Sequence, residues 1–168
     1  MSKKKEYYFK KSSFFGWGER SATLDKERVR LIDKNVAGKK ILDVGCSMGL
    51  YVDYLVSKGF DAYGVDFVTQ FIKEAKKSKK GTFVKGKAEK LPFKDNEFDS
   101  VILFNILEHG DDGKLLEEAK RVPKKRILLI VPKEVDEKLE QSGVVFRHYL
   151  DKSHLREYRV QDLENLAE

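Results

Sequence analysis

Two acidic side chains and two glycines have the spacing of a nucleoside-binding site. Asp43 is followed closely by Gly45 and Gly49, and a second acid, Asp66, comes about 20 residues later. Glycine lets the chain turn tightly and lets its backbone approach a ligand. An acid at this distance can accept hydrogen bonds from both ribose hydroxyls. The alternative for Asp66 is a cap of the next helix, but its pairing with the glycine turn favours ribose binding.

The glycine turn differs from the turns that bind phosphate groups. It lacks the G-x-G-x-x-G pattern, and no Lys-Ser or Lys-Thr pair follows it directly, as one would in a phosphate-binding loop. The carboxylate of Asp43 would repel a pyrophosphate group and attract a cation. The turn therefore predicts a nucleoside ligand that carries positive charge.

Two later stretches add candidate site residues. Ala88 and Glu89 follow the third predicted strand, and Asn105 and His109 follow the fourth. One interpretation of His109 is a general base that accepts a proton from the substrate nucleophile. The favoured interpretation is a histidine that shapes the pocket wall, because a site can act mainly by aligning its reactants.

The histidines and the cysteine predict no further chemistry. His109, His148 and His154 lack the spacing typical of metal ligands, so the sequence predicts no metal site. The single cysteine, Cys46, excludes an internal disulfide and is expected to be a small filler in the turn. A lone cysteine also fits the reducing cytosol.

Apolar runs that alternate with amphipathic segments would position these residues. The runs predict strands at residues 40–44, 60–65, 82–85, 98–105 and 126–131. The amphipathic segments predict helices at residues 22–35, 50–58, 68–79, 114–122, 133–141 and 160–167. Such alternation predicts parallel strands, whose carboxyl ends and candidate residues share one edge of a sheet.

Composition narrows the class of protein and its partners. The 168 residues predict one domain, with an N-terminal aromatic flap and helix in residues 1–38 and a cofactor-binding part in residues 39–168.

The net charge of +6 raises the question of an RNA partner, but interspersed acids favour a lysine-rich solvated surface. A content of 37% charged residues is thermophile-like. No apolar run approaches the roughly 20 residues that span a membrane, so we expect a cytoplasmic protein without a membrane partner.

Several stretches resemble motifs of the class I S-adenosylmethionine-dependent methyltransferases. Residues 42–49 resemble motif I, residues 64–66 the second motif, residues 86–93 and 98–101 the segment around the adenine, and residues 105–109 the segment after strand four. The likeness spans roughly residues 39–132 and is closest to the small-molecule branch. It implies a Rossmann-like α/β fold, with a doubly wound, mostly parallel sheet in the order 3-2-1-4-5, and S-adenosyl-L-methionine as cofactor.

The resemblance also implies roles for single residues. The backbone of Gly45, Ser47 and Gly49 would lie against the methionine part of the cofactor. Asp43 would orient the turn and the ammonium group, and Asp66 would hold the ribose hydroxyls. Four more residues would contact the adenine or the methionine moiety: Phe67, Ala88, Glu89 and Asn105.

Three features depart from the family pattern. Ser47 stands where the family often has Gly, Lys87 where it often has an acid, and the chain ends where the family usually adds two antiparallel strands. We therefore expect the C-terminal strands to be absent from this sequence. Either the sequence is truncated, or strand five is an edge that something must cover, which would permit an oligomer. The expected reaction is methyl transfer to a small-molecule acceptor. The alternatives are an RNA methyltransferase and a non-catalytic cofactor-binding module.

Overall fold

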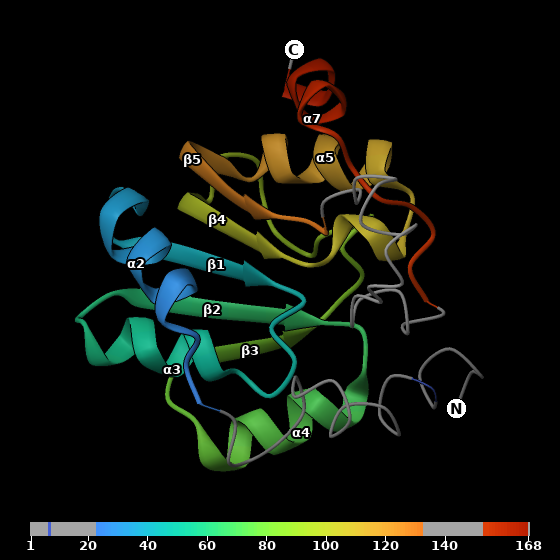
Figure 1. Cartoon of the computed structure of the whole chain (residues 1–168). Helices are drawn as coiled ribbons and strands as arrows, with labels where there is room; N and C mark the ends of the chain where they lie inside the picture. The colour runs from blue at the N-terminus through green and yellow to red at the C-terminus, as the bar shows by residue number, and fades with distance from the viewer. Residues whose placement is uncertain (1–6, 8–22, 133–152, 168) are drawn as a thin grey trace, which may run out of the picture.

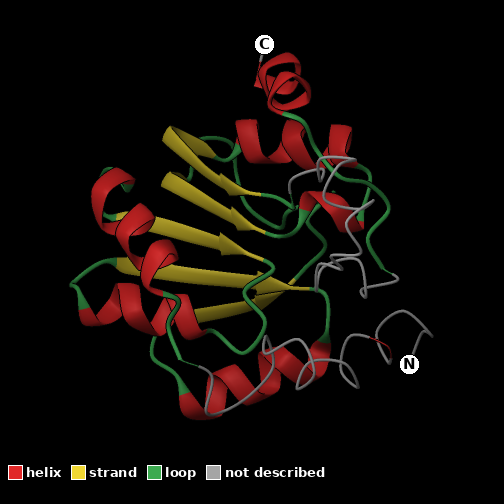
Figure 2. Cartoon of the chain, in the orientation of Figure 1, coloured by secondary structure: helices red, strands yellow, loops and turns green. Residues whose placement is uncertain are grey.

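A parallel five-stranded sheet forms the centre of the computed structural model, which describes residue 7, residues 23–132 and residues 153–167. The strand order is β3-β2-β1-β4-β5, which confirms the predicted order (Figure 1). The strands are β1 (Lys40–Val44), β2 (Asp61–Asp66), β3 (Thr82–Lys85), β4 (Phe98–Phe104) and β5 (Pro123–Ile130). They all point in one direction, so their carboxyl ends lie at one edge of the sheet (Figure 2).

The helices lie close to their predicted positions. In the described ranges they are α2 (Lys26–Asn35), α3 (Leu50–Ser57), α4 (Thr69–Ser78), α5 (Asp112–Arg121), α7 (Val160–Ala167) and the short 3-10 helix η1 (Leu107–His109). Asp25 caps α2, because its side chain accepts a hydrogen bond from the backbone N–H of Arg28 at 2.9 Å. The predicted helix at residues 133–141 and most of the aromatic flap lie outside the described residues.

Side-chain alternation along the strands divides the core into two layers. On one face, Ile41 and Ile102 pack with side chains of α2, α3 and α4. On the other face, Leu42 and Val101 pack with side chains of α5 and α7. Helices therefore cover both faces of the sheet, as the continuous apolar runs predict.

Element bounds shift by a few residues from the sequence-based expectations, and three differences have a clear physical reason or consequence. Strand β5 begins at Pro123, not at residue 126, because a proline without an N–H group is tolerated at the first position of an edge strand. Strand β4 ends at Phe104, because Asn105 takes a φ of 55°. The segment expected to be a loop after Asn105 contains η1.

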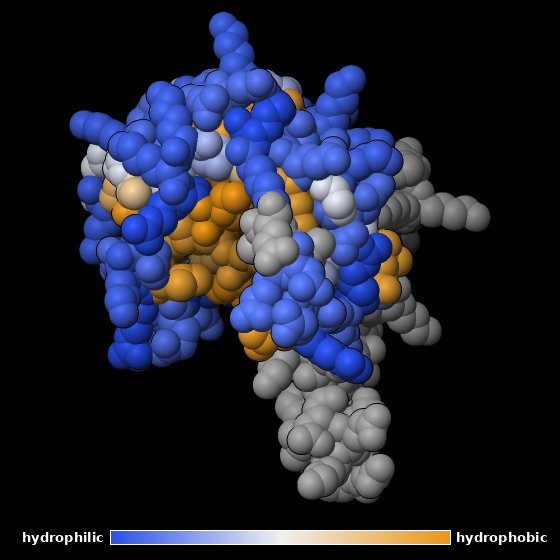
Figure 3. All heavy atoms as spheres, turned by 90° about the horizontal axis from the view of Figure 1, so that it is seen from above, coloured by the Kyte–Doolittle hydropathy of each residue, from blue (hydrophilic) through white to orange (hydrophobic). Residues whose placement is uncertain are grey.

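The outer edge of the described sheet carries positive charge. Strand β5 is terminal in the sheet, and Lys124, Lys125 and Arg126 are exposed on it. From the side on which β5 and α7 lie in Figure 1, most of the surface is hydrophilic, with one apolar hollow (Figure 3). Charged side chains on an edge strand oppose pairing with another strand. No helix in the described ranges is long and apolar enough to cross a membrane.

Candidate functional site

The turn after β1 holds its glycines in conformations that other residues rarely adopt. Gly45 and Gly49 have φ angles of 75° and 79°, and Ser47 between them has a φ of 49°. A Cβ atom on Gly45 would overlap the side chain of Ile106, and one on Gly49 would overlap the ring of Phe83. Both glycines are therefore required by the backbone conformation and by close packing, whatever the turn binds.

Strand β2 anchors this turn. The N–H of Gly45 donates to the carbonyl oxygen of Val65 at 2.8 Å. The carboxylate of Asp66 accepts from the N–H of Ser47 at 3.0 Å and from the N–H of Val68 at 2.7 Å. Because Val68 is the residue just before α4, Asp66 also serves the helix start, which was the alternative to ribose binding. The backbone N–H of Phe67 also interacts with this carboxylate, which has about four lone-pair sites in all.

Asp43 and Asp66 lie on the same face of the sheet. Asp43 is two residues beyond Ile41, and alternation along β2 places Asp66 on the face of Ala62. Ile41 and Ala62 both belong to the core under α2, α3 and α4. The two acids are buried, with 4% and 8% of their surface exposed. The fold therefore brings two carboxyl groups to the carboxyl ends of adjacent strands, beside the glycine turn.

Burial raises the pKa of both carboxyl groups. The pKa of Asp43 rises to about 8, mainly through burial and further through Asp66, while Arg28 opposes the rise. The pKa of Asp66 rises to about 6 through burial, while the N–H groups of Val68 and Ser47 oppose it. A cation beside this pair would stabilise the ionised form of both acids. The electrostatics thus agree in sign with the positively charged ligand that the sequence predicts.

Arg28 of α2 reaches this edge, although no motif in the sequence points to it. Its Nη2 donates to the Oδ1 of Asn105 at 2.5 Å, and its Cζ lies 5.6 Å from the ring centroid of Phe104. One signal was available: Arg28 lies four residues before the buried Ile32, which places it on the inward face of the helix. The N-terminal helix therefore contributes a cation to the same edge as Asn105.

The other predicted adenine contacts lie in two regions of the structure, one at the start of α4 and the other near α5 and η1. Phe67 is half-buried and packs with Val68 and Phe71 at the start of α4. Ala88 packs on the core under α5. The Oε1 of Glu89 lies 2.9 Å from where a Cβ on Gly110 would be, so Glu89 reaches toward the end of η1. Contacts of these residues with an adenine ring stay a prediction.

Cys46 has a packing role within the turn. It is buried, with 6% of its surface exposed, and a Cβ on Gly64 would lie 2.7 Å from its sulfur. Burial raises the pKa of the Cys46 thiol, so the sulfur stays protonated and unreactive. These contacts agree with the small filler that the sequence predicts.

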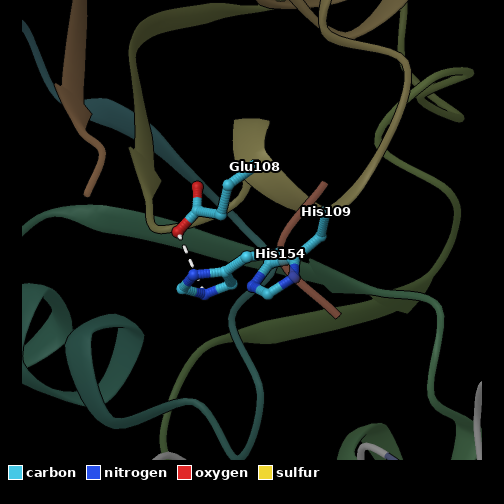
Figure 4. A group of neighbouring side chains, drawn as sticks. All are labelled: Glu108, His109 and His154. Atoms are coloured by element: carbon cyan, nitrogen blue, oxygen red, sulfur yellow. Dashed lines mark ion pairs between the residues drawn. The ribbon is translucent and has the colours of Figure 1, made fainter. Parts of the chain in front are cut away.

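His109 belongs to a cluster of three side chains that sequence spacing did not reveal. The cluster comprises Glu108 and His109 of η1 and His154, which lies beside them (Figure 4). The ring centroids of His109 and His154 are 4.8 Å apart, and the Oε1 of Glu108 lies 3.9 Å from the Nε2 of His154. The ring Nδ1 of His109 lies 3.1 Å from the Oγ of Ser153. His148 lies outside the described residues.

The fold and this edge together define a class of protein. A doubly wound α/β sheet binds its ligand beyond the carboxyl ends of its strands, near the point where the strand order reverses. Here that point lies between β1 and β4, where the glycine turn, Asp43 and Asn105 meet. The chain is therefore a Rossmann-like domain with the features of a nucleoside-binding site.

Comparisons with known proteins assign the family. A family described as "Methyltransferase domain" matches residues 42–131. The chain is 34% identical over 108 residues to the uncharacterised protein MJ0638 of Methanocaldococcus jannaschii, covering 62% of this chain and 46% of that protein. It is 34% identical over 98 residues to the demethylmenaquinone methyltransferase of Renibacterium salmoninarum, covering 57% and 41%.

A solved structure supports the fold. The SAM-dependent methyltransferase from Archaeoglobus fulgidus has a TM-score of 0.70 at 24% identity, covering 96% of this chain and 72% of that one. The chain spans about half the length of the curated relatives it matches, with 46% and 54% covered in two of them. It belongs to the methyltransferase-domain family, within the class I S-adenosylmethionine-dependent methyltransferases.

Proposed function

We propose that this protein transfers a methyl group from S-adenosylmethionine to an acceptor molecule. The observation that carries the proposal is the pair of buried acids, Asp43 and Asp66, beside the glycine turn. Burial raises the pKa of both carboxyl groups, and a ligand with a sulfonium and an ammonium group would stabilise their ionised forms. When bound, the cofactor supplies the activated methyl group.

The residues present fit such a cofactor. Asp66 would accept hydrogen bonds from the ribose hydroxyls at the lone-pair sites that its backbone N–H contacts leave open. Asp43 lies buried on the adjacent strand, where it would hold the ammonium group through water. Arg28, bonded to Asn105 and close enough to Asp43 to oppose the rise in its pKa, would pair with the carboxylate of the methionine part.

The remaining residues would complete the pocket. The backbone of Gly45, Ser47 and Gly49 would lie along the methionine part, with Asn105 opposite. The adenine would be contacted by Phe67, Ala88 and Glu89. His109 would shape the wall on the acceptor side, and the chain would act mainly by aligning the acceptor with the methyl group.

We propose a small-molecule acceptor. The support is the likeness to a relative named demethylmenaquinone methyltransferase and to one named ubiquinone biosynthesis O-methyltransferase. An RNA acceptor is the second candidate, because α4 exposes Lys73, Lys76 and Lys77 beside a net charge of +6. RNA binding that weakens steeply with salt would favour the second candidate.

Calorimetry with S-adenosylhomocysteine tests the cofactor directly. We expect saturable binding to one site per chain, and no heat of binding at millimolar ligand would overturn the proposal. A panel of small phenols, quinols and amines with radiolabelled S-adenosylmethionine then tests methyl transfer. Binding without turnover on any acceptor, RNA included, would indicate the non-catalytic module instead.

A further inference from the structure

We propose that Glu108, His109 and His154 bind a divalent transition-metal ion of the zinc class. The three side chains offer one carboxylate oxygen and two imidazole nitrogens, and these atoms all lie within 4.8 Å of one another. The inference concerns binding of the metal alone. It therefore stands independently of the methyl transfer proposed above.

The spacing of the ligand atoms is close to that of a bound site. Zinc binds histidine nitrogen and carboxylate oxygen at about 2.0–2.2 Å, which places neighbouring ligands of a tetrahedral site about 3.4 Å apart. The Oε1 of Glu108 lies 3.9 Å from the Nε2 of His154. Side-chain rotations that move the ligand atoms by roughly 1–1.5 Å would bring all three to one ion.

The contacts of the His109 ring permit a tautomer that suits this role. Its Nδ1 lies 3.3 Å from the carbonyl oxygen of Ser153 and 3.1 Å from the hydroxyl oxygen of that residue. In the tautomer with the proton on Nδ1, that proton is donated to the carbonyl oxygen and Nε2 would be the atom that binds the metal. Metal-bound histidines commonly use their second nitrogen in this way, and the bond fixes the orientation of the ring.

Backbone contacts hold the two halves of the cluster together. The N–H of Leu155 donates to the carbonyl oxygen of Glu108 at 2.7 Å, which joins the residue after His154 to η1. Farther along, Arg156 forms an ion pair with Asp112 at the start of α5. The cluster is thus assembled from two distant segments by contacts that do not involve the proposed ligand atoms, which lowers the ordering cost of binding a metal.

Burial favours a cation at this position. The side chain of Glu108 has none of its surface exposed, and that of His154 has 15% exposed. A buried carboxylate is costly to ionise, and a divalent ion offsets that cost. Two imidazoles with one carboxylate suit zinc, cobalt or iron better than calcium or magnesium, which prefer oxygen ligands. Three protein ligands leave at least one coordination position open.

Metal titration of the untagged, chelator-treated chain tests the site. We expect zinc to bind with a stoichiometry of one per chain in calorimetry, and cobalt to give the visible absorption of a low-coordinate nitrogen and oxygen site. Glu108→Gln, His109→Ala and His154→Ala should each weaken zinc binding by more than about 100-fold, beyond the usual effect of removing an outer-shell partner. Glu117→Gln, at an exposed position of α5, is the matched control and should bind zinc as the wild type does.

Two results would overturn the proposal. One is the absence of stoichiometric zinc and cobalt binding to the folded wild-type chain, which needs no variant. The other is equal zinc affinity in the wild type and in ligand variants whose circular dichroism spectra are native. The S-adenosylhomocysteine titration of the same wild-type sample reports on the proposed function separately, so the failure of one proposal does not hide the outcome of the other.

Discussion

Arg28 and Asn105 are joined by a hydrogen bond of 2.5 Å from the guanidinium Nη2 to the amide Oδ1. This bond connects α2 to the carboxyl end of β4, where Asn105 takes a left-handed backbone conformation. The same guanidinium opposes the rise in the pKa of Asp43. The N-terminal helix is therefore part of the candidate site.

Arg28→Ala should weaken the binding of S-adenosylhomocysteine. The change removes the proposed partner of the methionine carboxylate, and a hydrogen bond to a charged group contributes about 1.5–3 kcal/mol, so affinity should fall by about 10- to 100-fold. Arg30→Ala is the matched control, because Arg30 lies on the same helix, exposed, and pairs only with Glu27 among its described contacts. Calorimetry measures both. Equal affinities in the two variants would remove Arg28 from the site.

Asp66→Asn should reduce both ligand affinity and stability. The amide group cannot accept hydrogen bonds at both positions that now serve Ser47 and Val68. We expect a loss of about 1–3 kcal/mol in the free energy of unfolding and at least a tenfold loss of S-adenosylhomocysteine affinity. Asp61→Asn, at the exposed start of the same strand, should change neither quantity. Lower stability with unchanged affinity would leave Asp66 only its role at the helix start.

Binding of S-adenosylmethionine should release a proton near pH 7. The pKa of Asp43 is raised to about 8, so this acid is largely protonated at neutral pH and must ionise when a cation binds beside it. Affinity should therefore increase as the pH rises toward 8. Calorimetry in buffers with different ionisation enthalpies measures the proton release, and Asp43→Asn should abolish it. An apparent binding enthalpy independent of the buffer would contradict the assignment.

The same acid predicts how stability depends on pH. A carboxyl group whose pKa is higher in the folded than in the unfolded chain binds more protons when folded. The contribution of Asp43 to the free energy of unfolding is therefore fully present below about pH 4 and is lost as the pH rises toward 8. Other carboxyl groups, whose pKa values are lowered by folding, change the stability in the opposite sense. The informative quantity is therefore the difference in the free energy of unfolding between the wild type and Asp43→Asn. Thermal unfolding of both at several pH values should show the wild type becoming less stable relative to Asp43→Asn as the pH rises from about 4 toward 8.

Local patterns in the sequence predicted the fold well. The apolar run that ends at Val44, followed by Gly45 and Gly49, predicted a strand, a turn and a helix, and the structure has all three. The signal is strong there because periodicity and glycine chemistry act within a few residues. The exact start of β5 was missed, because Pro123 permits both the end of a helix and the start of an edge strand.

The site could be predicted only where it lies within the motifs. Asp43 and Asp66 are found from strand ends, and the structure brings them together. Arg28 and His154 reach the same edge from distant segments through tertiary packing, which no local spacing encodes. The expectation of no metal site rested on spacing along the chain, whereas the cluster at His109 forms only in three dimensions.

Gly45→Ala should be much more destabilising than Gly59→Ala. Both glycines have positive φ angles, of 75° and 87°. A Cβ on Gly59 would meet nothing within 4 Å, so that variant shows the backbone cost alone, about 1–2 kcal/mol. A Cβ on Gly45 would overlap the side chain of Ile106, which adds a packing cost of about 1–3 kcal/mol.

A second change separates the two costs at Gly45. Ile106→Ala opens space for the new methyl group but leaves the backbone conformation as it is. Chemical denaturation measures the loss in the free energy of unfolding. In the Ile106→Ala background, the loss from Gly45→Ala should be about equal to the loss from Gly59→Ala in the wild type. If Gly45→Ala is equally costly in both backgrounds, the contact with Ile106 does not limit this position. The glycine would then be required by its φ angle alone, and the close approach of the two loops would have no part in shaping the turn.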